Sequence, residues 1–568
     1  MQHSRSCRRS ILLAFSLLSA CAAADPAGNA GRGTADVSGS AYGAYLAGRF
    51  AASQTDLDRA ARDLLHAYAV DPGHPELLQQ TFLACLMDGR PEATRLAGLL
   101  PDNPAAQLLL ADEDARSGRW DAAEQRYHAL PHQGLTQLLQ PLLVAWAQQG
   151  GGRTDTALAT LRPYVEGQRF RGAYALHAAL IADLGDRQTD AARLYHIAQT
   201  EYGGLNLRLA QILASWQARQ GHLNEAQQTL RSLGESSDDM AMVLPGLIAA
   251  ESARPVSSAT DGIAEAYLAL AAALRQQDAT EYALLLLRLA LDMHGDFTAA
   301  RLLMADILDA EKHPGNALAA LAPVAESDPL APLVRLRRAA LLEQSGNTEE
   351  AMRTLDGLAR DYPTRPEPLA QMGDILRMKS RFGEAVGAYD RAIARVSHPV
   401  HNDWPLFYDR GIALERSKQW PKAEADLEHA LELSPDEPYV LNYLGYSWAE
   451  QGHNLARARQ MIERALELRP NDGAIADSLG WVLLRQGDVA GAIHWLEHAV
   501  ELQPEDATIN AHLGDAYWAA GRKLEAQYQW QLALSMKPEP DDVARLEAKL
   551  HEAEAQNGAA TTAERRIQ

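Results

Sequence analysis

The sequence predicts an all-α protein, a right-handed superhelical solenoid built from about 14 helical hairpins. Two observations support this prediction. Ala, Leu, Glu, Arg and Gln are abundant among the 568 residues and β-branched residues are scarce, a bias that favours helices over strands. In addition, small residues recur with a period near 34 residues, which is typical of stacked helical hairpins.

The repeat is clearest from residue 264 onward, where each unit places a small residue after the start of an apolar helix. Successive separations are 34, 34, 34, 38, 34, 35 and 34 residues. Two helices pack closely only where one side is small, so Gly or Ala must recur at each crossing point. One hairpin cannot bury its own apolar face, whereas stacked neighbours share a continuous core. The eight small positions are Ala271, Ala305, Ala339, Gly373, Gly411, Gly445, Gly480 and Gly514.

Residues 1–20 predict a signal peptide rather than part of the fold. Arg5, Arg8 and Arg9 precede an apolar stretch over residues 11–18, and small residues follow it. The stretch is too short for a membrane-spanning helix, which needs about 20 apolar residues. We therefore expect an exported protein.

The end of this segment, LSAC at residues 18–21, resembles the lipobox of bacterial lipoproteins. The resemblance implies that Cys21 is acylated, for example with palmitate, and becomes the first mature residue. Ala22 after the cysteine implies sorting to the outer membrane, with the body of the protein in the periplasm. The alternative is ordinary signal cleavage near residues 22–24, with Cys21 discarded or left free.

The rest of the chain divides by composition and period. Residues 21–40 are small, polar and Gly-rich, as in a flexible tether behind the lipidated cysteine. Residues 41–234 keep a degenerate form of the repeat. Residues 235–263 break the period and predict an irregular joint, either a flexible hinge or a loop packed into the superhelix. After the regular units, residues 541–568 predict a polar capping helix and a disordered tail.

The eight regular units over residues 264–540 resemble the tetratricopeptide repeat (TPR) family. The cleanest copies lie in residues 404–540 and read LNYLGYSWAEQG, AIADSLGWVLLRQGDVAGAIHWLEHAVELQP and NAHLGDAYWAAGRKLEAQYQWQLAL. Four extra residues near 396–403 and one near Asn454 lengthen loops without removing a helix. The resemblance implies a solenoid of helical hairpins whose first helices line a concave face.

Composition and motifs argue against several classes of function. Seventy-four acidic residues outnumber 53 basic ones, giving a formal net charge of −21. A nucleic-acid-binding surface needs clustered Lys and Arg, and no such run occurs. The sequence contains no HExxH, CxxC, GxSxG, Walker A or GxGxxG motif, and its 18 histidines are scattered along the chain, where we expect them to be solvated or satisfied in the core. We therefore expect no catalytic residues, metal, cofactor or small-molecule substrate, and no enzyme.

The TPR resemblance also implies which residues face a ligand. In that family they fall at positions 2, 5, 9 and 12 of a unit whose small residue is position 8. On this chain the positions form an aromatic and acidic set. They are Tyr408 and Glu415, then Tyr439, Asn442 and Tyr446, then Asp477, Trp481 and Leu484, and finally Asp515 and Trp518.

Two interpretations of this set remain open. In the first, the residues line a groove for an extended peptide, where aromatic rings supply contact area and the Asn442 amide bonds the peptide backbone. In the second, neighbouring inner helices pack their aromatic side chains on one another. The family's carboxylate clamp, a Lys and Asn pair that grips a chain terminus, is absent from these positions.

A second resemblance covers nearly the whole mature chain. Residues 42–78, YGAYLAGRFAASQTDLDRAARDLLHAYAVDPGHPELL, together with LNYLGY and DSLGWVLLRQG, are similar to long TPR lipoproteins of Gram-negative envelopes. The family includes outer-membrane adaptors that bind a periplasmic carboxyl-terminal processing protease and deliver cell-wall hydrolases to it. The resemblance implies a lipid-anchored scaffold that binds proteins or extended peptides in the periplasm. The alternative is a structural component of an envelope export or polysaccharide secretion machine.

Overall fold

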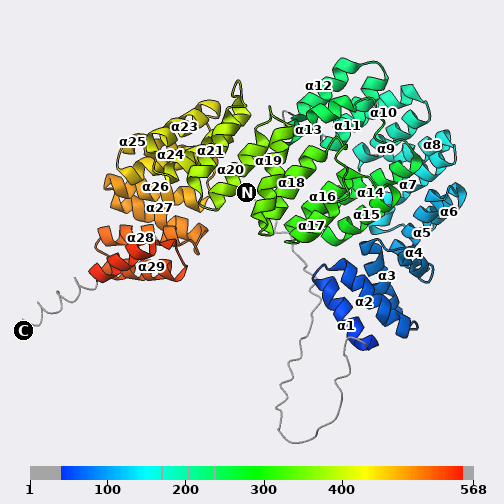
Figure 1. Ribbon diagram of the computed structural model, residues 1–568, viewed down its shortest axis with the longest axis horizontal. Coiled ribbons are helices and arrows are strands. Elements are labelled where there is room, and N and C mark those ends of the chain that lie inside the picture. Colours follow the sequence, from blue (N-terminus) through cyan, green and yellow to red (C-terminus); the bar gives the residue numbers. More distant parts are fainter. Residues whose placement is uncertain (1–39, 168–169, 203–204, 235–237, 541, 554–568) are drawn as a thin grey trace, which may run out of the picture. The chain divides into compact units, whose positions relative to one another are not determined.

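The computed structural model of the chain describes residues 40–553 except 168–169, 203–204, 235–237 and 541. In that part the regular structure is helical and no strand occurs, which confirms the predicted all-α class (Figure 1). The predicted signal peptide, Cys21, nearly all of the predicted tether and the predicted tail beyond residue 553 lie outside the described residues.

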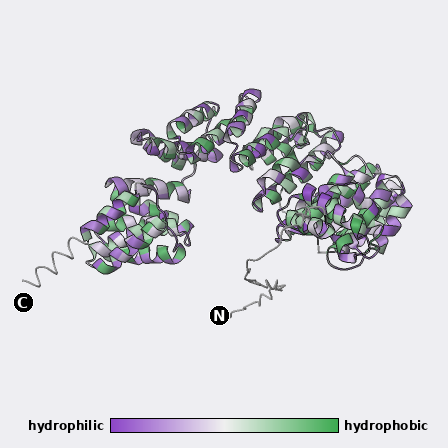
Figure 2. Ribbon diagram, turned by 60° about the horizontal axis from the view of Figure 1, so that its bottom comes forward, coloured by the Kyte–Doolittle hydropathy of each residue, from purple (hydrophilic) through white to green (hydrophobic). Residues whose placement is uncertain are grey.

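The described helices are amphipathic or buried rather than uniformly apolar. Figure 2 shows hydrophilic and hydrophobic residues mixed along them. Among these helices, none combines the length and the apolar character needed to cross a bilayer.

The chain divides after Leu96 into two compact units. The first begins with α1 (Ala41–Ser53), α2 (Leu57–Val70) and α3 (Pro75–Asp88), and α4 (Glu92–Ala97) spans its end. α1 and α2 cross at Gly48, where a Cβ atom would lie only 2.7 Å from Cγ of Leu64. Cys85 of α3 is fully buried, as its apolar neighbours in the sequence predict, and burial raises the pKa of its thiol to about 12.

The second unit is a series of paired helices. In chain order the pairs are α5 (Pro104–Arg116) with α6 (Trp120–Ala129), α7 (Gly134–Gly150) with α8 (Thr154–Glu166), α9 (Arg171–Leu184) with α10 (Gln188–Glu201), α11 (Leu207–Arg219) with α12 (Leu223–Gly234), α14 (Ala259–Arg275) with α15 (Thr280–Met293), α16 (Thr298–Ala310) with α17 (Pro314–Leu321), α18 (Ala331–Gln344) with α19 (Thr348–Asp361), α20 (Glu367–Met378) with α21 (Phe382–Ile393), α22 (Trp404–Arg416) with α23 (Trp420–Leu433), α24 (Pro438–Gln451) with α25 (Leu455–Leu468), α26 (Gly473–Gln486) with α27 (Val489–Leu502), and α28 (Ala507–Ala519) with α29 (Lys523–Ser535). The pairing agrees with the prediction of about 14 hairpins.

The small residue of each unit lies where its two helices touch. A Cβ atom on Gly480 of α26 would lie 2.5 Å from Cγ of Leu496 in α27, and one on Gly514 of α28 would lie 2.5 Å from the Trp530 ring in α29. No larger side chain fits at such a distance without moving its neighbour. The recurring Gly and Ala therefore determine how closely the two helices of each hairpin approach each other.

The first helices of the hairpins lie on the inner side of the array. α7 contacts α9, α24 contacts α26, and α26 contacts α28. Within the described part of the chain, second helices of neighbouring hairpins make far fewer contacts with each other. We call the surface formed by α20, α22, α24, α26 and α28 the inner face.

The segment 235–263 corrects a prediction, because most of its described part is not irregular. Residues 238–249 form α13 (Asp238–Ala249), and α14 already begins at Ala259. α13 packs against α12, α18 and α20, and its Met242 and Val243 are fully buried. The repeat period is interrupted here, so the pattern could not reveal a single unpaired helix that is stabilised by burial between distant hairpins.

α14 also packs outside its own hairpin, against α7 and α9 of the preceding array, while α15 contacts α5. Gly262 allows this approach, since a Cβ atom there would lie 2.3 Å from the Trp146 ring of α7. Because α5, α7 and α9 are first helices, α14 occupies the inner side of the earlier hairpins. Ten of its residues are buried.

After α29 the chain forms one more helix, over residue 540 and residues 542–553. Leu546 is 1% exposed and Ala553 is fully buried, and both join the apolar core of the last four hairpins. Residues 544, 545, 547 and 548 on its other side are exposed. We call residues 540–553 the C-terminal helix.

Candidate binding surface

The residues that the sequence predicts for a groove all lie on α22, α24, α26 and α28, and the structure brings most of them into contact. On α22, the Tyr408 ring lies 5.8 Å from that of Trp404 and 5.9 Å from that of Tyr443 on α24. The hydroxyl of Tyr443 donates a hydrogen bond of 3.2 Å to Glu415. Burial raises the pKa of Tyr408 to about 12.

Two predicted groove residues of α24 differ in exposure. Tyr439 is 42% exposed, and the guanidinium of Arg469 lies 5.4 Å from the centre of its ring. The Asn442 carbonyl oxygen Oδ1 is buried without a hydrogen-bond partner in the described part of the chain. Tyr439 can therefore contact a ligand directly, whereas the Asn442 oxygen is shielded from one.

A histidine that the sequence analysis did not single out organises the centre of the inner face. Nδ1 of His512 on α28 lies 2.9 Å from both carboxylate oxygens of Asp477 on α26. Its ring stacks on Trp481 at 4.2 Å and lies 6.2 Å from the ring of Tyr446. Burial disfavours the charged imidazole, but the Asp477 carboxylate outweighs it and raises the pKa of His512 above its usual value.

Asp477 and Trp481, which the sequence predicts to line the groove, are buried in this cluster. Asp477 is 5% exposed and Trp481 is 9% exposed. Their side chains pack across neighbouring inner helices, as in the second of the two interpretations. Nε1 of Trp481 nevertheless has no partner in the described residues. His512 gave no sequence signal, because its two contacts depend on how α28 stacks on α26.

The last two predicted residues, Asp515 and Trp518 on α28, contact side chains of the C-terminal helix and α29. Nε1 of Trp530 donates a hydrogen bond of 2.9 Å to Asp515, and Nζ of Lys549 lies 2.6 Å from the same carboxylate. The Trp518 ring lies 5.4 Å from that of Trp530. The inner face at α28 is therefore covered by the chain itself.

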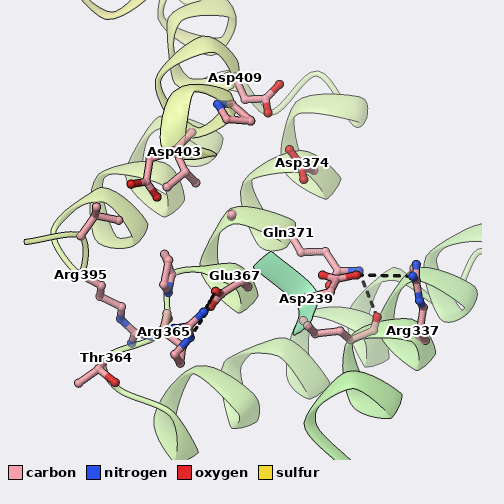
Figure 3. A pocket seen from close by; sticks show the side chains of 17 residues that line it. Asp239, Arg337, Thr364, Arg365, Glu367, Gln371, Asp374, Arg395, Asp403 and Asp409 are labelled. Atoms are coloured by element: carbon pink, nitrogen blue, oxygen red, sulfur yellow. Dashed lines mark hydrogen bonds and ion pairs between the residues drawn. The ribbon is translucent and has the colours of Figure 1, made fainter. Parts of the chain in front are cut away.

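A cavity of about 440 Å³ opens at the other end of the inner face, between α13, α18, α20 and α22 (Figure 3). No pattern within one repeat signals this cavity, because its walls combine α13 with the first helices of three successive hairpins. Carboxylates outnumber guanidinium groups in its lining. The acids are Asp239, Glu367, Asp374, Asp403 and Asp409, and the bases are Arg337, Arg365 and Arg395.

Each of the three guanidinium groups already has partners. Arg395 donates to the carbonyl oxygens of Ala359, Tyr362 and Arg365. Arg365 pairs with Glu367, and Arg337 lies 3.5 Å from Asp239 (Figure 3). Acidic groups remain in excess in the lining, with five carboxyl groups against three guanidinium groups.

Asp374 and Asp409 lie on either side of a fourth guanidinium group, that of Arg377. Asp374 accepts a hydrogen bond of 2.6 Å from Tyr389, and Arg377 lies 3.2 Å from Asp409. Burial, followed by the charge of Asp374, raises the pKa of Asp409 to about 7. Two carboxylates that share one arginine in this way favour a further cation, such as a Lys or Arg side chain. No group of three or more His, Cys, Asp or Glu side chains able to hold a metal ion occurs in the described part of the chain.

Comparison with known protein families matches the C-terminal half of the chain. Residues 255–402 match a tetratricopeptide repeat-like domain. Residues 408–473, 450–507 and 477–539 match a tetratricopeptide repeat family. A TPR repeat-containing protein of Pseudomonas aeruginosa is 25% identical over 199 residues, which is 35% of this chain. The match spans only 33% of that relative's length.

Solved structures of similar architecture share little sequence with the chain. The Cut9–Hcn1 hetero-tetramer of the APC/C aligns with a TM-score of 0.38 and 16% identity over 90% of this chain and 95% of that one. A tetratricopeptide repeat protein of Parabacteroides merdae aligns with a TM-score of 0.36 and 15% identity over 44% and 97%. YrrB, described as a TPR protein with an unusual peptide-binding site, aligns with a TM-score of 0.27 and 18% identity over 34% and 97%.

Proposed function

Because the chain is a tetratricopeptide repeat protein, we propose that it is a non-enzymatic scaffold, anchored to the outer membrane through Cys21, that holds periplasmic proteins together. The observation that carries the proposal is the inner face. It runs over five successive first helices and presents the exposed ring of Tyr439 and an acidic cavity. Such a surface suits an extended or helical protein segment with basic residues.

In its most specific form the proposal makes the chain an adaptor. One partner is a carboxyl-terminal processing protease and the other is a cell-wall hydrolase. Two partners held on one scaffold meet at an effective concentration of about millimolar, so a weak protease–substrate contact becomes productive. The support for this form is the similarity of residues 42–78 and of the C-terminal units to envelope lipoproteins of that kind.

The test is crosslinking in living cells. A photoreactive amino acid at Tyr439, which is exposed on the inner face, is compared with one at Leu524, which is 75% exposed on α29. The adaptor proposal expects the protease, a hydrolase or both to be captured from Tyr439 and not from Leu524. Recovery of neither would contradict it, and stoichiometric recovery of an outer-membrane β-barrel would favour the export-machine alternative.

The lipid anchor has its own test. Replacing Cys21 with Ser should release the mature protein from the membrane fraction into the soluble periplasmic fraction, since acyl chains stabilise membrane attachment by about 0.8 kcal/mol per buried CH₂ group. Unchanged membrane attachment of the Cys21→Ser variant would contradict acylation at that residue.

A further inference from the structure

The C-terminal helix does more than cover the last hairpin. A simple cap would contact only α28 and α29. Here Glu539, just before the helix, lies 3.3 Å from Arg416 at the end of α22, 123 residues earlier. Lys549 reaches Asp515 on α28, and Leu550 packs against the same apolar core as Tyr446 of α24. The contacts of Glu539 and Lys549 therefore reach from α22 to α28 along the inner face.

The contacts of this helix follow one side of it. Leu546, Leu550 and Ala553 recur at helical spacing and pack into the core of the last hairpins together with Tyr446 and Trp518. Lys549 lies on the same side and pairs with Asp515 at 2.6 Å. The binding pattern is thus a leucine, a basic residue three positions later and a leucine one position after that.

The attachment is much weaker than that of the other segment that lies on an inner surface. α14 has ten buried residues, including fully buried Tyr267. Among residues 542–553 only Leu546 and Ala553 are buried. Burial of apolar area dominates the stability of such contacts, so α14 is a fixed part of the fold and the C-terminal helix can be displaced.

We propose that the inner face of α24, α26 and α28 is a binding site for an amphipathic helix of a partner protein that carries the pattern Leu-x-x-Lys/Arg-Leu, and that the C-terminal helix occupies this site in the free chain. The inference deepens the proposed scaffold function, on which it rests, by naming the partner's chemistry. The negative charge of Asp515 selects the basic residue, and the apolar core of the last hairpins receives the leucines.

Because the C-terminal helix already occupies the site, a partner must compete with it for binding. A tethered segment competes at an effective concentration of about millimolar. A free helix of the same sequence therefore binds the intact chain weakly and binds tightly once the tethered helix is released. A partner that reaches the site must exceed the tethered helix in affinity.

A labelled peptide of residues 539–553, EPDDVARLEAKLHEA, provides the probe, and fluorescence anisotropy measures its binding to the full mature chain. Lys549→Glu and the double variant Leu546→Asp/Lys549→Glu weaken the tethered helix. Glu547→Lys, on its exposed side, is the matched control. We expect the peptide to bind the released chains at least tenfold more tightly than the wild type or the control. A peptide that itself carries Lys549→Glu should not bind.

Hydrogen exchange over residues 542–553 shows whether the tethered helix has left. If exchange accelerates in the variants and the peptide still fails to bind, the site does not accept this helix and the inference is wrong. If exchange stays slow even in the double variant, the helix is a fixed cap, which also overturns the inference. Neither result affects the crosslinking test of the scaffold function, because that test scores proteins captured at Tyr439.

Discussion

The hydroxyl of Tyr267 on α14 donates a hydrogen bond of 2.9 Å to the carboxylate of Asp112 on α5, 155 residues earlier in the chain. Tyr127 of α6 donates to the same carboxylate at 2.6 Å. All three residues are fully buried. The bond links hairpins that are not neighbours in sequence, and so fixes how the array folds back on itself.

Removing the Tyr267 hydroxyl should destabilise this region. A buried hydrogen bond to a carboxylate contributes about 1.5–3 kcal/mol, so at pH 8, where Asp112 is mostly ionised, Tyr267→Phe should lower the free energy of unfolding by roughly that amount. Urea unfolding followed by circular dichroism measures the change. Tyr282→Phe, at a tyrosine that is 58% exposed, should leave the midpoint unchanged. Equal midpoints for both variants would show that the link contributes nothing.

The same carboxylate predicts how stability depends on pH. Burial raises the pKa of Asp112 from 3.8 to about 7, although the hydrogen bonds from Tyr127 and Tyr267 oppose the shift. Between these values the folded state holds a proton that the unfolded state has lost, so this contribution to stability is present near pH 4 and is lost as pH rises to 7. The wild type should lose stability over this range relative to Asp112→Asn, whose amide still accepts hydrogen bonds.

Thermal unfolding of both proteins at half-unit steps from pH 4 to pH 8 checks this sign. His177 contributes in the opposite direction, because burial lowers its pKa to about 3 and its stabilisation is lost as pH falls below 6.5. Because both proteins contain His177, its contribution cancels when the stability of Asp112→Asn is subtracted from that of the wild type. A constant difference across the range would contradict a titrating Asp112.

Alanine substitutions at two glycines should change the free energy of unfolding in opposite directions. At Gly262 a Cβ atom would lie 2.3 Å from the Trp146 ring, so Gly262→Ala should destabilise by about 1–3 kcal/mol through overpacking. At Gly387, inside α21, nothing lies within 4 Å of the added atom. Gly387→Ala should therefore stabilise the helix by about 0.5–1 kcal/mol. Urea midpoints of the two variants should move in opposite directions, and movement of both in the same direction would contradict the packing at Trp146.

Local and distant contacts explain which features the sequence could predict. Gly480 and Gly514 meet residues of their own hairpins, so a single unit of sequence specifies the contact and the repeat predicts the hairpins. The pairing of Asp477 with His512 depends instead on how successive hairpins stack. A position that the repeat pattern predicts to face a ligand is here packed against a neighbouring hairpin, and no residue within one unit signals that difference.

The thiol of Cys85 should resist modification. It is fully buried in α3, and burial raises its pKa to about 12, so the reactive thiolate is scarce at pH 8. In a chain with Cys7 and Cys21 replaced by Ser, iodoacetamide should label Cys85 only after denaturation. A cysteine placed at exposed Ser53 is the control and should react in the folded protein. Labelling of both at similar rates would contradict the packing of α3.

The acidic cavity predicts binding that strengthens with pH. The pKa of Asp409 is raised to about 7 by burial and by the neighbouring charge of Asp374, so its carboxyl is mostly neutral at pH 6 and mostly ionised at pH 8. A labelled tetralysine peptide should bind more tightly as pH rises over this range, because the ionised carboxylate attracts its ammonium groups. Asp409→Asn should remove most of that increase. Glu311→Gln, at an exposed acid away from the cavity, should preserve it. If both variants keep the same pH dependence, the peptide is held by the general negative charge of the chain and the cavity is not its site.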